Sequence, residues 1–236
     1  MHPGCRPDAM LILALDTSTE IGSVAIGDRN GIIATSTLPV RGAHSESMLP
    51  AMRDLLTRAD VSIGDLEGVA VGSGPGSFTG LRVGASLAKG LCFGRGLPLF
   101  AYSSLSAVVA GRSVEGRACA MFDARGGRVF AATYESTIPL VDRTAPQVWT
   151  VPELILDLQP LDDWTFGGDG AMRYEDLIVT AGGRLLPEDE SRPHAEALLH
   201  LTRERPDGRV KDVRSWQPEY LLPSAAERLS DRRALR

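Results

Sequence analysis

Two predicted β-hairpins, one at the start of the chain and one at its middle, constrain the fold of these 236 residues most. Short apolar runs at Leu11–Asp16, Gly22–Gly27 and Ile32–Leu38 predict three strands bounded by polar turn residues. Asn30 and Gly31 lie between the second and third runs, and Asn-Gly is a strong sequence signal for a tight hairpin turn. We therefore expect the chain to open with a three-stranded antiparallel meander.

A helical period follows the meander. Apolar residues recur at intervals of three and four through His44–Ala59, although Pro50 allows a start as late as Ser47 or a kink. The first half is completed by a strand (69–72), a helix (79–94), a second strand (98–101) and a short helix (103–110). The predicted order of elements is β-β-β-α-β-α-β-α.

The second half repeats this order in outline. Ala118–Asp123 and Val129–Tyr134 predict a second antiparallel hairpin, and a helix, a strand and a helix follow at 152–158, 164–166 and 195–202. Two α/β units that each open with antiparallel strands favour the duplicated actin-like ATPase (ASKHA) fold over a single doubly wound sheet. The expected divisions are a flexible leader (1–9), a first subdomain (10–111), a second subdomain (112–229) and a tail (230–236). The last helix of the second subdomain can return to the first.

Charge and cysteine content exclude several classes of protein. With 25 basic and 30 acidic residues the chain has a net charge of −5, which argues against nucleic-acid binding over its whole surface. Cys5, Cys92 and Cys119 form no C-x-x-C pair, so neither a disulfide framework nor a zinc ribbon is expected. The apolar run Met10–Leu15 is too short for a signal sequence or a membrane span. We expect a soluble cytoplasmic protein that does not contact a membrane.

Two polar turns are candidate anion sites. Asp16, Thr17 and Ser18 end the first predicted strand, where a carboxylate and hydroxyls could hold a metal-bound phosphate or could satisfy an Asx turn. The loop Gly72–Ser77 lacks the lysine of a Walker A sequence, yet it could present backbone N–H groups to an anion at a helix N-terminus. A tight strand-to-helix turn capped by a hydroxyl side chain explains the same loop.

The helix predicted at 79–94 carries several small residues. Gly80, Gly84 and Ala88 are four residues apart and therefore line one face of the helix. Each glycine inside a helix costs roughly 1 kcal/mol relative to alanine. Close approach of a second backbone, with dense dispersion contacts, would offset this cost. That backbone could belong to this chain or to another protein, and the spacing leaves both readings open.

No set of residues predicts a catalytic or metal site. The histidines of the chain are His2, His44, His194 and His200. No two of them have metal-ligand spacing such as H-x-x-x-H. Cys92 falls on the apolar pattern of a helix and is expected to be inert. Asp16 and Asp123 end strands in equivalent places of the two halves, where a kinase would need one to position magnesium and one to act as a base.

Six segments of the chain carry a resemblance to a known family. They are Leu13–Thr19, Ala43–Pro50, Val71–Lys89, Phe122–Arg125, Gly168–Gly170 and Pro218–Leu221. Together they resemble the TsaB family, also called YeaZ, from Met10 to about Leu229, and Gly74–Arg82 (GPGSFTGLR) is the most specific segment. The resemblance implies an actin-like ATPase fold. It also implies a dimerisation subunit of the bacterial complex that makes threonylcarbamoyladenosine at position 37 of tRNAs reading codons that begin with A.

The resemblance also implies partners and a lack of catalysis. In the catalytic paralogue TsaD, the segment equivalent to Pro98–Val108 carries two metal-binding histidines, and here Ser104 and Val108 stand at those positions. The implied role is a scaffold that binds TsaD, recruits the ATPase TsaE, forms a homodimer when alone and meets tRNA only through the complex. No tightly bound cofactor is implied, and ATP and magnesium would act at the level of the complex.

Under this hypothesis the helices at 79–94 and 47–59 contact TsaD. The expected interface residues are Phe78, Thr79, Gly80, Arg82, Val83, Gly84, Leu87, Ala88, Leu91, Met48 and Met52. The chain departs from the family pattern at Leu222, where many relatives have arginine, and this argues against an anion-binding role there.

Two other hypotheses use the same residues differently. An independent ATP-dependent small-molecule kinase would take the Asp16 turn as its phosphate element and Phe166–Ala171 as a loose adenosine element. Its candidate nucleotide-binding residues are Asp16, Thr17, Ser18, Gly168, Asp169 and Gly170. A metallopeptidase would need a histidine pair, which the sequence lacks.

Overall fold

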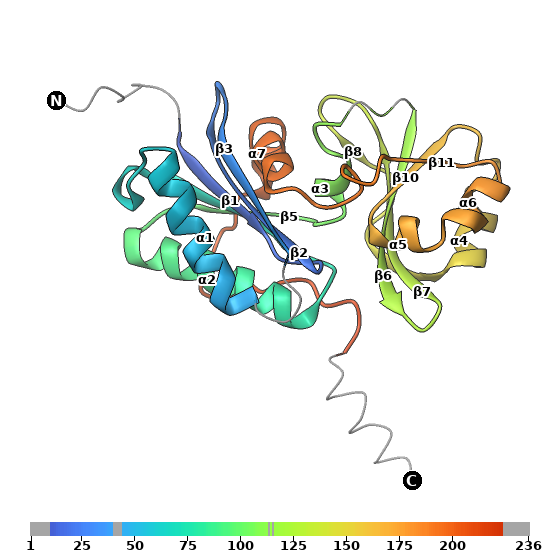
Figure 1. Cartoon of the computed structure of the whole chain (residues 1–236), viewed down its shortest axis with the longest axis horizontal. Helices are drawn as coiled ribbons and strands as arrows, with labels where there is room; N and C mark the ends of the chain where they lie inside the picture. The colour runs from blue at the N-terminus through green and yellow to red at the C-terminus, as the bar shows by residue number, and fades with distance from the viewer. Residues whose placement is uncertain (1–9, 40–43, 113, 115, 224–236) are drawn as a thin grey trace, which may run out of the picture.

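The computed structural model describes residues 10–39, 44–112, 114 and 116–223, which form two α/β lobes side by side (Figure 1). The first lobe is built on a five-stranded sheet in the order β3-β2-β1-β4-β5. Its strands are β1 (Ile12–Asp16), β2 (Ile21–Asp28), β3 (Gly31–Pro39), β4 (Gly68–Gly72) and β5 (Leu99–Tyr102). The first three form the antiparallel meander expected from the sequence, whereas β4 pairs in parallel with β1 and β5 in parallel with β4.

Helices cover both faces of this sheet. On one face lie α1 (His44–Arg58) and α2 (Phe78–Arg95), and on the other lies α7 (Ala195–Glu204) (Figure 1). Successive residues of β1 point to these two layers, as the pleat of a strand requires. Leu15 is part of the core beneath α1 and α2, while Ala14 is part of the core that includes α7. The shorter helices of this lobe are η1 (Ile63–Asp65) and α3 (Ser106–Val109).

The second lobe is built on a six-stranded mixed sheet in the order β11-β10-β6-β7-β8, with β9 also paired to β7. The strands are β6 (Arg117–Arg125), β7 (Arg128–Glu135), β8 (Val141–Asp142), β9 (Gln147–Thr150), β10 (Trp164–Gly167) and β11 (Arg184–Leu185). The helices are α4 (Val151–Leu158), α5 (Asp169–Arg173) and α6 (Glu175–Thr180). Apolar residues of β6, β10, α4 and α6 form the core of this lobe, among them Met121, Phe166, Leu154 and Ile178.

The chain returns to the first lobe at α7 and stays there. After η2 (Pro206–Gly208), the Val210 N–H donates a 2.8 Å hydrogen bond to the Leu99 carbonyl at the edge of β5. Further on, the Glu219 N–H donates to the Ser73 carbonyl at 2.7 Å. The first lobe thus includes the chain from α7 to Pro223, which is more than the single returning helix expected from the sequence.

The duplicated α/β architecture predicted from the order of elements is confirmed, because each lobe opens with an antiparallel hairpin and adds parallel strands. Each strand and helix expected from the apolar pattern is present, with shifts only at the ends. Helix α1 begins at His44, so Pro50 lies inside it and does not delay its start. The elements that the pattern did not predict, β8, β9, β11, α5 and α6, are too short to show a clear period.

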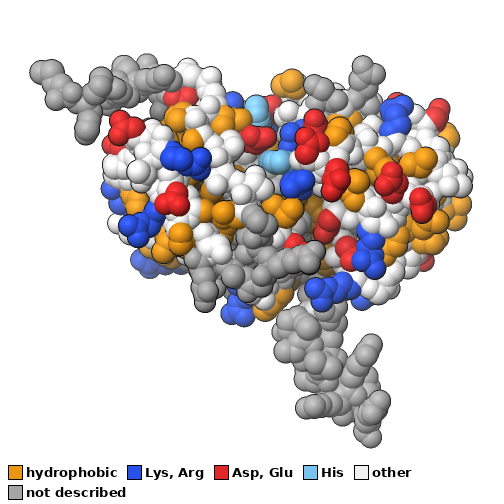
Figure 2. Space-filling model, viewed as in Figure 1, with side chains coloured by type: hydrophobic (Ala, Val, Ile, Leu, Met, Phe, Trp, Pro, Cys, Tyr) orange, Lys and Arg blue, Asp and Glu red, His pale blue; other side chains and the backbone are white. Residues whose placement is uncertain are grey.

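The surface charges and the composition of the helices give two further constraints. Acidic and basic side chains alternate over the visible face of both lobes (Figure 2), so this face carries no continuous basic surface for nucleic acid. None of the described helices combines the length and the apolar character that crossing a bilayer requires.

Candidate functional site

Helix α2 positions most of the residues expected at an interface. Ser77 caps its N-terminus, since the Ser77 Oγ accepts a hydrogen bond from the Gly80 N–H at 3.3 Å. Gly96 ends the helix in the left-handed conformation, with a φ of 67°. Between these two caps, one face of α2 packs on the sheet and the other is exposed, so the two faces have different roles.

The inner face carries the small residues at four-residue spacing. Gly80, Gly84 and Ala88 are buried, and a Cβ atom on Gly84 would lie 2.4 Å from the Thr17 Oγ1. The Thr17 hydroxyl also donates a 2.7 Å hydrogen bond to the Gly80 carbonyl. The backbone that approaches this stripe therefore belongs to the same chain. The prediction that these three residues contact another protein is wrong, because β1 and the turn after it fill the groove.

The two methionines expected at the interface are internal as well. Met48 is 0% and Met52 is 2% exposed, and both pack with Leu55 in the core beneath α1. The prediction for these methionines is therefore wrong, because the apolar face of α1 turns inward, as amphipathic helices do. Leu49 lies on the outer side of α1 instead, with 49% of its surface exposed.

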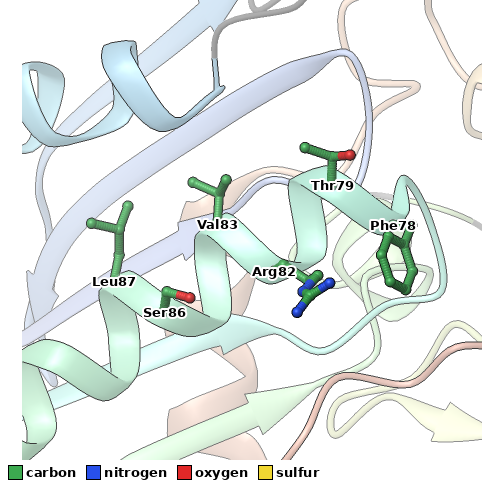
Figure 3. Close-up of a pocket in the computed structure, with 6 residues that line it drawn as sticks. All are labelled: Phe78, Thr79, Arg82, Val83, Ser86 and Leu87. Carbon is green, nitrogen blue, oxygen red and sulfur yellow. The ribbon is translucent and has the colours of Figure 1, made fainter.

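The outer face of α2 carries the other expected residues. Thr79, Val83 and Leu87 follow one edge of the helix, and Phe78 and Arg82 project on its other side (Figure 3). Together with Ser86 they line a shallow depression of about 420 Å³. The expected interface residues that reach the surface are Phe78, Thr79, Arg82, Val83, Leu87 and Leu91.

Two glycines of α2 have no explanation within the described chain. A Cβ atom on Gly90 or on Gly94 would meet no described atom within 4 Å outside its own stretch of helix. Ser86, Gly90 and Gly94 are four residues apart, so they form a second stripe of small residues on the exposed side. A glycine in a helix costs roughly 1 kcal/mol relative to alanine, and no contact described here offsets it. The sequence reasoning missed this second stripe, although the same spacing reveals it.

The turn after β1 is closed by its own hydrogen bonds. Asp16 is fully buried, and its Oδ1 accepts from the Ser18 N–H at 2.8 Å and from the Ser18 hydroxyl at 2.6 Å. Its Oδ2 accepts from the Ser104 hydroxyl at 2.7 Å. Of the two readings left open for this turn, the structure contains the Asx turn. The Asp16 carboxylate organises the backbone and does not face an open space.

The glycine loop before α2 packs against this turn. Its N–H groups at Ser73, Gly74 and Ser77 donate to acceptors of the protein. A Cβ atom on Gly72 would lie only 1.8 Å from the Asp16 Oδ2, so the loop approaches the turn too closely for a side chain there. The loop is a tight strand-to-helix connection, and the use of these three N–H groups within the protein argues against an open row of anion donors.

The second-lobe candidates, Gly168–Gly170, lie at the junction of β10 and α5. The Gly168 N–H donates to the Ser191 hydroxyl at 2.8 Å, and the Asp169 Oδ1 accepts from the Asp123 N–H at 3.1 Å. The pKa of Asp169 is raised to about 6, mainly because the surrounding protein removes water from its carboxylate and also because the Asp123 and Glu20 charges are near. Glu20 belongs to the first lobe, so acidic groups of both lobes act on this carboxylate.

The described residues show no cluster suited to metal binding. No group of three or more histidine, cysteine, aspartate or glutamate side chains among them could hold an ion. Ser104 is bound to Asp16, and Val108 is 0% exposed in the core. Burial raises the pKa of the Cys92 thiol to about 11, so the reactive thiolate is disfavoured at neutral pH.

Comparisons of sequence match the chain to proteins of tRNA modification. The family model described as tRNA N6-adenosine threonylcarbamoyltransferase (TsaD) matches residues 38–162. The "tRNA threonylcarbamoyladenosine biosynthesis protein TsaB" of Escherichia coli strain K12 is 32% identical over 231 residues, which cover 92% of this chain and 96% of that protein. The protein of the same name from Bacillus subtilis strain 168 is 31% identical over 225 residues, with the same coverage of 92% and 96%.

A solved structure gives the same result. YeaZ from Pseudomonas aeruginosa superposes on this chain with a TM-score of 0.74 and 29% sequence identity. The superposition covers 89% of this chain and 99% of that structure. With 89% of the chain covered, the shared fold extends over both lobes.

Proposed function

The chain belongs to the TsaB (YeaZ) family, and from that premise we propose that it is a non-catalytic subunit that binds TsaD through the outer face of α2. It takes part in the biosynthesis of threonylcarbamoyladenosine in tRNA. The observation that carries the proposal is the exposed stripe Ser86, Gly90 and Gly94. No close packing among the described residues requires glycine at Gly90 or Gly94.

The chemistry of this face suits a helix of another protein. Small residues allow a second helix backbone to approach closely and to gain dense dispersion contacts. Val83 and Leu87 stand beside the stripe as half-buried apolar side chains, and Leu49 on the neighbouring α1 is exposed. A partner helix laid along α2 would cover these apolar groups and would offset the cost of the exposed glycines.

The proposal that this chain is non-catalytic is supported by the turn after β1. Its carboxylate, Asp16, is buried and occupied by the hydroxyl and amide donors of Ser18 and Ser104. The neighbouring loop has its N–H groups at Ser73, Gly74 and Ser77 engaged in the same way. A phosphate would have to displace these internal bonds, which argues against the alternative of an independent kinase.

The remaining parts of the proposal come from the family. TsaB would bring TsaD and the ATPase TsaE together for modification of adenosine 37 in tRNAs that read codons beginning with A. In the absence of TsaD the same face would pair with a second copy of the chain. ATP, magnesium and tRNA would be bound at the level of the complex, in the cytoplasm. For tRNA this agrees with the visible face of this chain, which has no continuous basic area (Figure 2).

A binding experiment tests the proposal. The wild-type chain and the variant Gly90→Leu are each titrated with TsaD from the same organism, and the mass of the complex is measured after size exclusion. The free chain has room for the leucine, whereas a packed interface does not, so we expect about 5- to 150-fold weaker binding. Thr180→Leu, at an exposed position of α6 in the second lobe, is the matched control.

Two results would contradict the proposal. Unchanged TsaD binding by Gly90→Leu would remove α2 from the interface. Steady ATP turnover by the purified chain, in proportion to its concentration, would contradict a non-catalytic role.

Cells that carry only the Gly90→Leu variant should also contain less threonylcarbamoyladenosine than cells with the Thr180→Leu control.

A further inference from the structure

The C-terminal segment of the described chain runs along the side of α2. The Lys89 ammonium group donates to the Arg214 carbonyl at 3.2 Å and lies 5.9 Å from the centre of the Trp216 ring. The Glu219 N–H donates to the Ser73 carbonyl in the loop that leads into the helix. The segment is therefore fastened both to α2 and to the loop before it.

At the start of α2 this segment adds an aromatic ring to the outer face. The rings of Tyr220 and Phe78 have centres 4.9 Å apart and planes inclined by 42°. The Arg82 guanidinium lies 5.2 Å from the centre of the same Phe78 ring. Phe78 thus contacts both side chains at one end of the depression, and Tyr220 is itself 38% exposed.

Arg82 is held in place but lacks an acidic partner among the described residues. It is exposed, and none of the ion pairs found between described side chains includes it. A guanidinium that rests on an aromatic ring loses less side-chain entropy when it binds an acceptor. Its planar fork of donors matches a carboxylate. The outer face of α2 therefore presents a positioned cation at the depression that the apolar Val83 and Leu87 also line.

We propose that Tyr220 is a positioning residue of the partner-binding face: it holds Phe78, Phe78 holds Arg82, and Arg82 binds a carboxylate of the partner protein. The inference rests on the proposed function and extends the binding face from α2 onto the C-terminal segment. The complementary surface would have an apolar centre, to cover Val83 and Leu87, and an acidic residue at the end that meets Arg82.

Titration of TsaD with a set of variants tests this arrangement at low and at high salt. Tyr220→Ala should weaken binding about threefold to tenfold, which is the range of a lost aromatic pair. Tyr220→Phe keeps the ring and should bind as the wild type. Arg82→Ala should weaken binding about tenfold and should also reduce the loss of affinity caused by added salt, because a charge pair is screened by salt.

A double-mutant cycle separates positioning from a general effect on the fold. If Tyr220 acts through Arg82, Tyr220→Ala should cost little further affinity in the Arg82→Ala background. Arg173→Ala is the matched control, because Arg173 is exposed and lies 5.8 Å from the ring of Tyr174 in the second lobe. This control should leave TsaD binding and its salt dependence unchanged.

The outcomes distinguish the inference from the function on which it rests. Wild-type binding by Tyr220→Ala or by Arg82→Ala, together with lost binding by Gly90→Leu, would overturn the inference and leave the proposed function intact. Additive effects in the cycle would overturn the positioning role of Tyr220. A wild-type chain that does not bind TsaD at all would overturn both.

Discussion

Gly84 and Gly90 share one helix and have opposite reasons for being glycine. A side chain on Gly84 would meet the Thr17 hydroxyl oxygen at 2.4 Å, whereas a side chain on Gly90 would enter open space. The first glycine is required by the packing of α2 on β1 within this chain. The second glycine lowers the stability of the helix, and no contact among the described residues offsets this cost. We therefore assign it to a contact with a partner.

We expect alanine at these two positions to have effects of opposite sign on stability. Gly90→Ala should raise the free energy of unfolding by about 1 kcal/mol, because it improves helix propensity without a clash. Gly84→Ala should lower it by about 1–3 kcal/mol, because the new methyl group overpacks the groove at Thr17. Urea unfolding of the isolated chain measures both. A stability gain for Gly84→Ala would contradict the close packing seen at Thr17.

At the scale of elements, the turn after β1 joins parts of the first lobe that are distant in sequence. Asp16 binds Ser18 within the turn and Ser104 beyond the end of β5. Thr17, the next residue, holds α2 through the Gly80 carbonyl. The same short segment thus fixes a strand, a helix and the chain after another strand. Its polar residues are explained by this structural role.

Asp16→Ala should therefore act on stability. The substitution leaves the Ser18 N–H and the Ser104 hydroxyl without their acceptor in a buried place, so we expect a loss of about 2–3 kcal/mol in the free energy of unfolding. Chemical unfolding followed by circular dichroism measures this loss, with Asp28→Ala, at the hairpin turn, as a comparison. A variant as stable as the wild type would contradict the structural role.

At the scale of the whole molecule, the segment around α7 ties the two lobes together. Ser191 contacts Gly168 in the second lobe, and Ala195 donates its N–H to the Ser23 hydroxyl in the first, at 2.9 Å. At the end of α7, the Arg205 guanidinium forms two hydrogen bonds with the Asp142 carboxylate of β8, at 2.9 and 2.8 Å. These contacts span the junction between the lobes (Figure 1).

The bidentate pair of Arg205 and Asp142 provides a test of this junction. Arg205→Ala and Asp142→Ala should each lower the free energy of unfolding by about 1 kcal/mol, since both side chains are partly exposed and solvent screens the pair. The double variant should be only slightly worse than either single one, because both remove the same interaction. Thermal unfolding of the four proteins measures the coupling. Fully additive losses would show that the pair does not join the lobes.

Much of the fold could be predicted from local patterns. The Asn30-Gly31 turn, the apolar strands and the three- and four-residue period of α1 and α2 all specify their own conformation, because they depend on neighbours in sequence. The candidate site was predicted less well. The pattern showed that α2 carries closely spaced small residues, but two such stripes are present and only one of them is exposed.

Local patterns along the chain were sufficient to specify the two α/β units that open with hairpins and the amphipathic helices, and the quoted motifs were sufficient to identify the family. Tertiary structure alone decided which stripe of α2 stays free and whether the Asp16 carboxylate is open or closed. The physical reason is that both outcomes depend on atoms distant in the chain. The Thr17 hydroxyl fills the groove at Gly84, and the Ser104 hydroxyl completes the hydrogen bonds of Asp16, only once the strands of the first sheet are assembled.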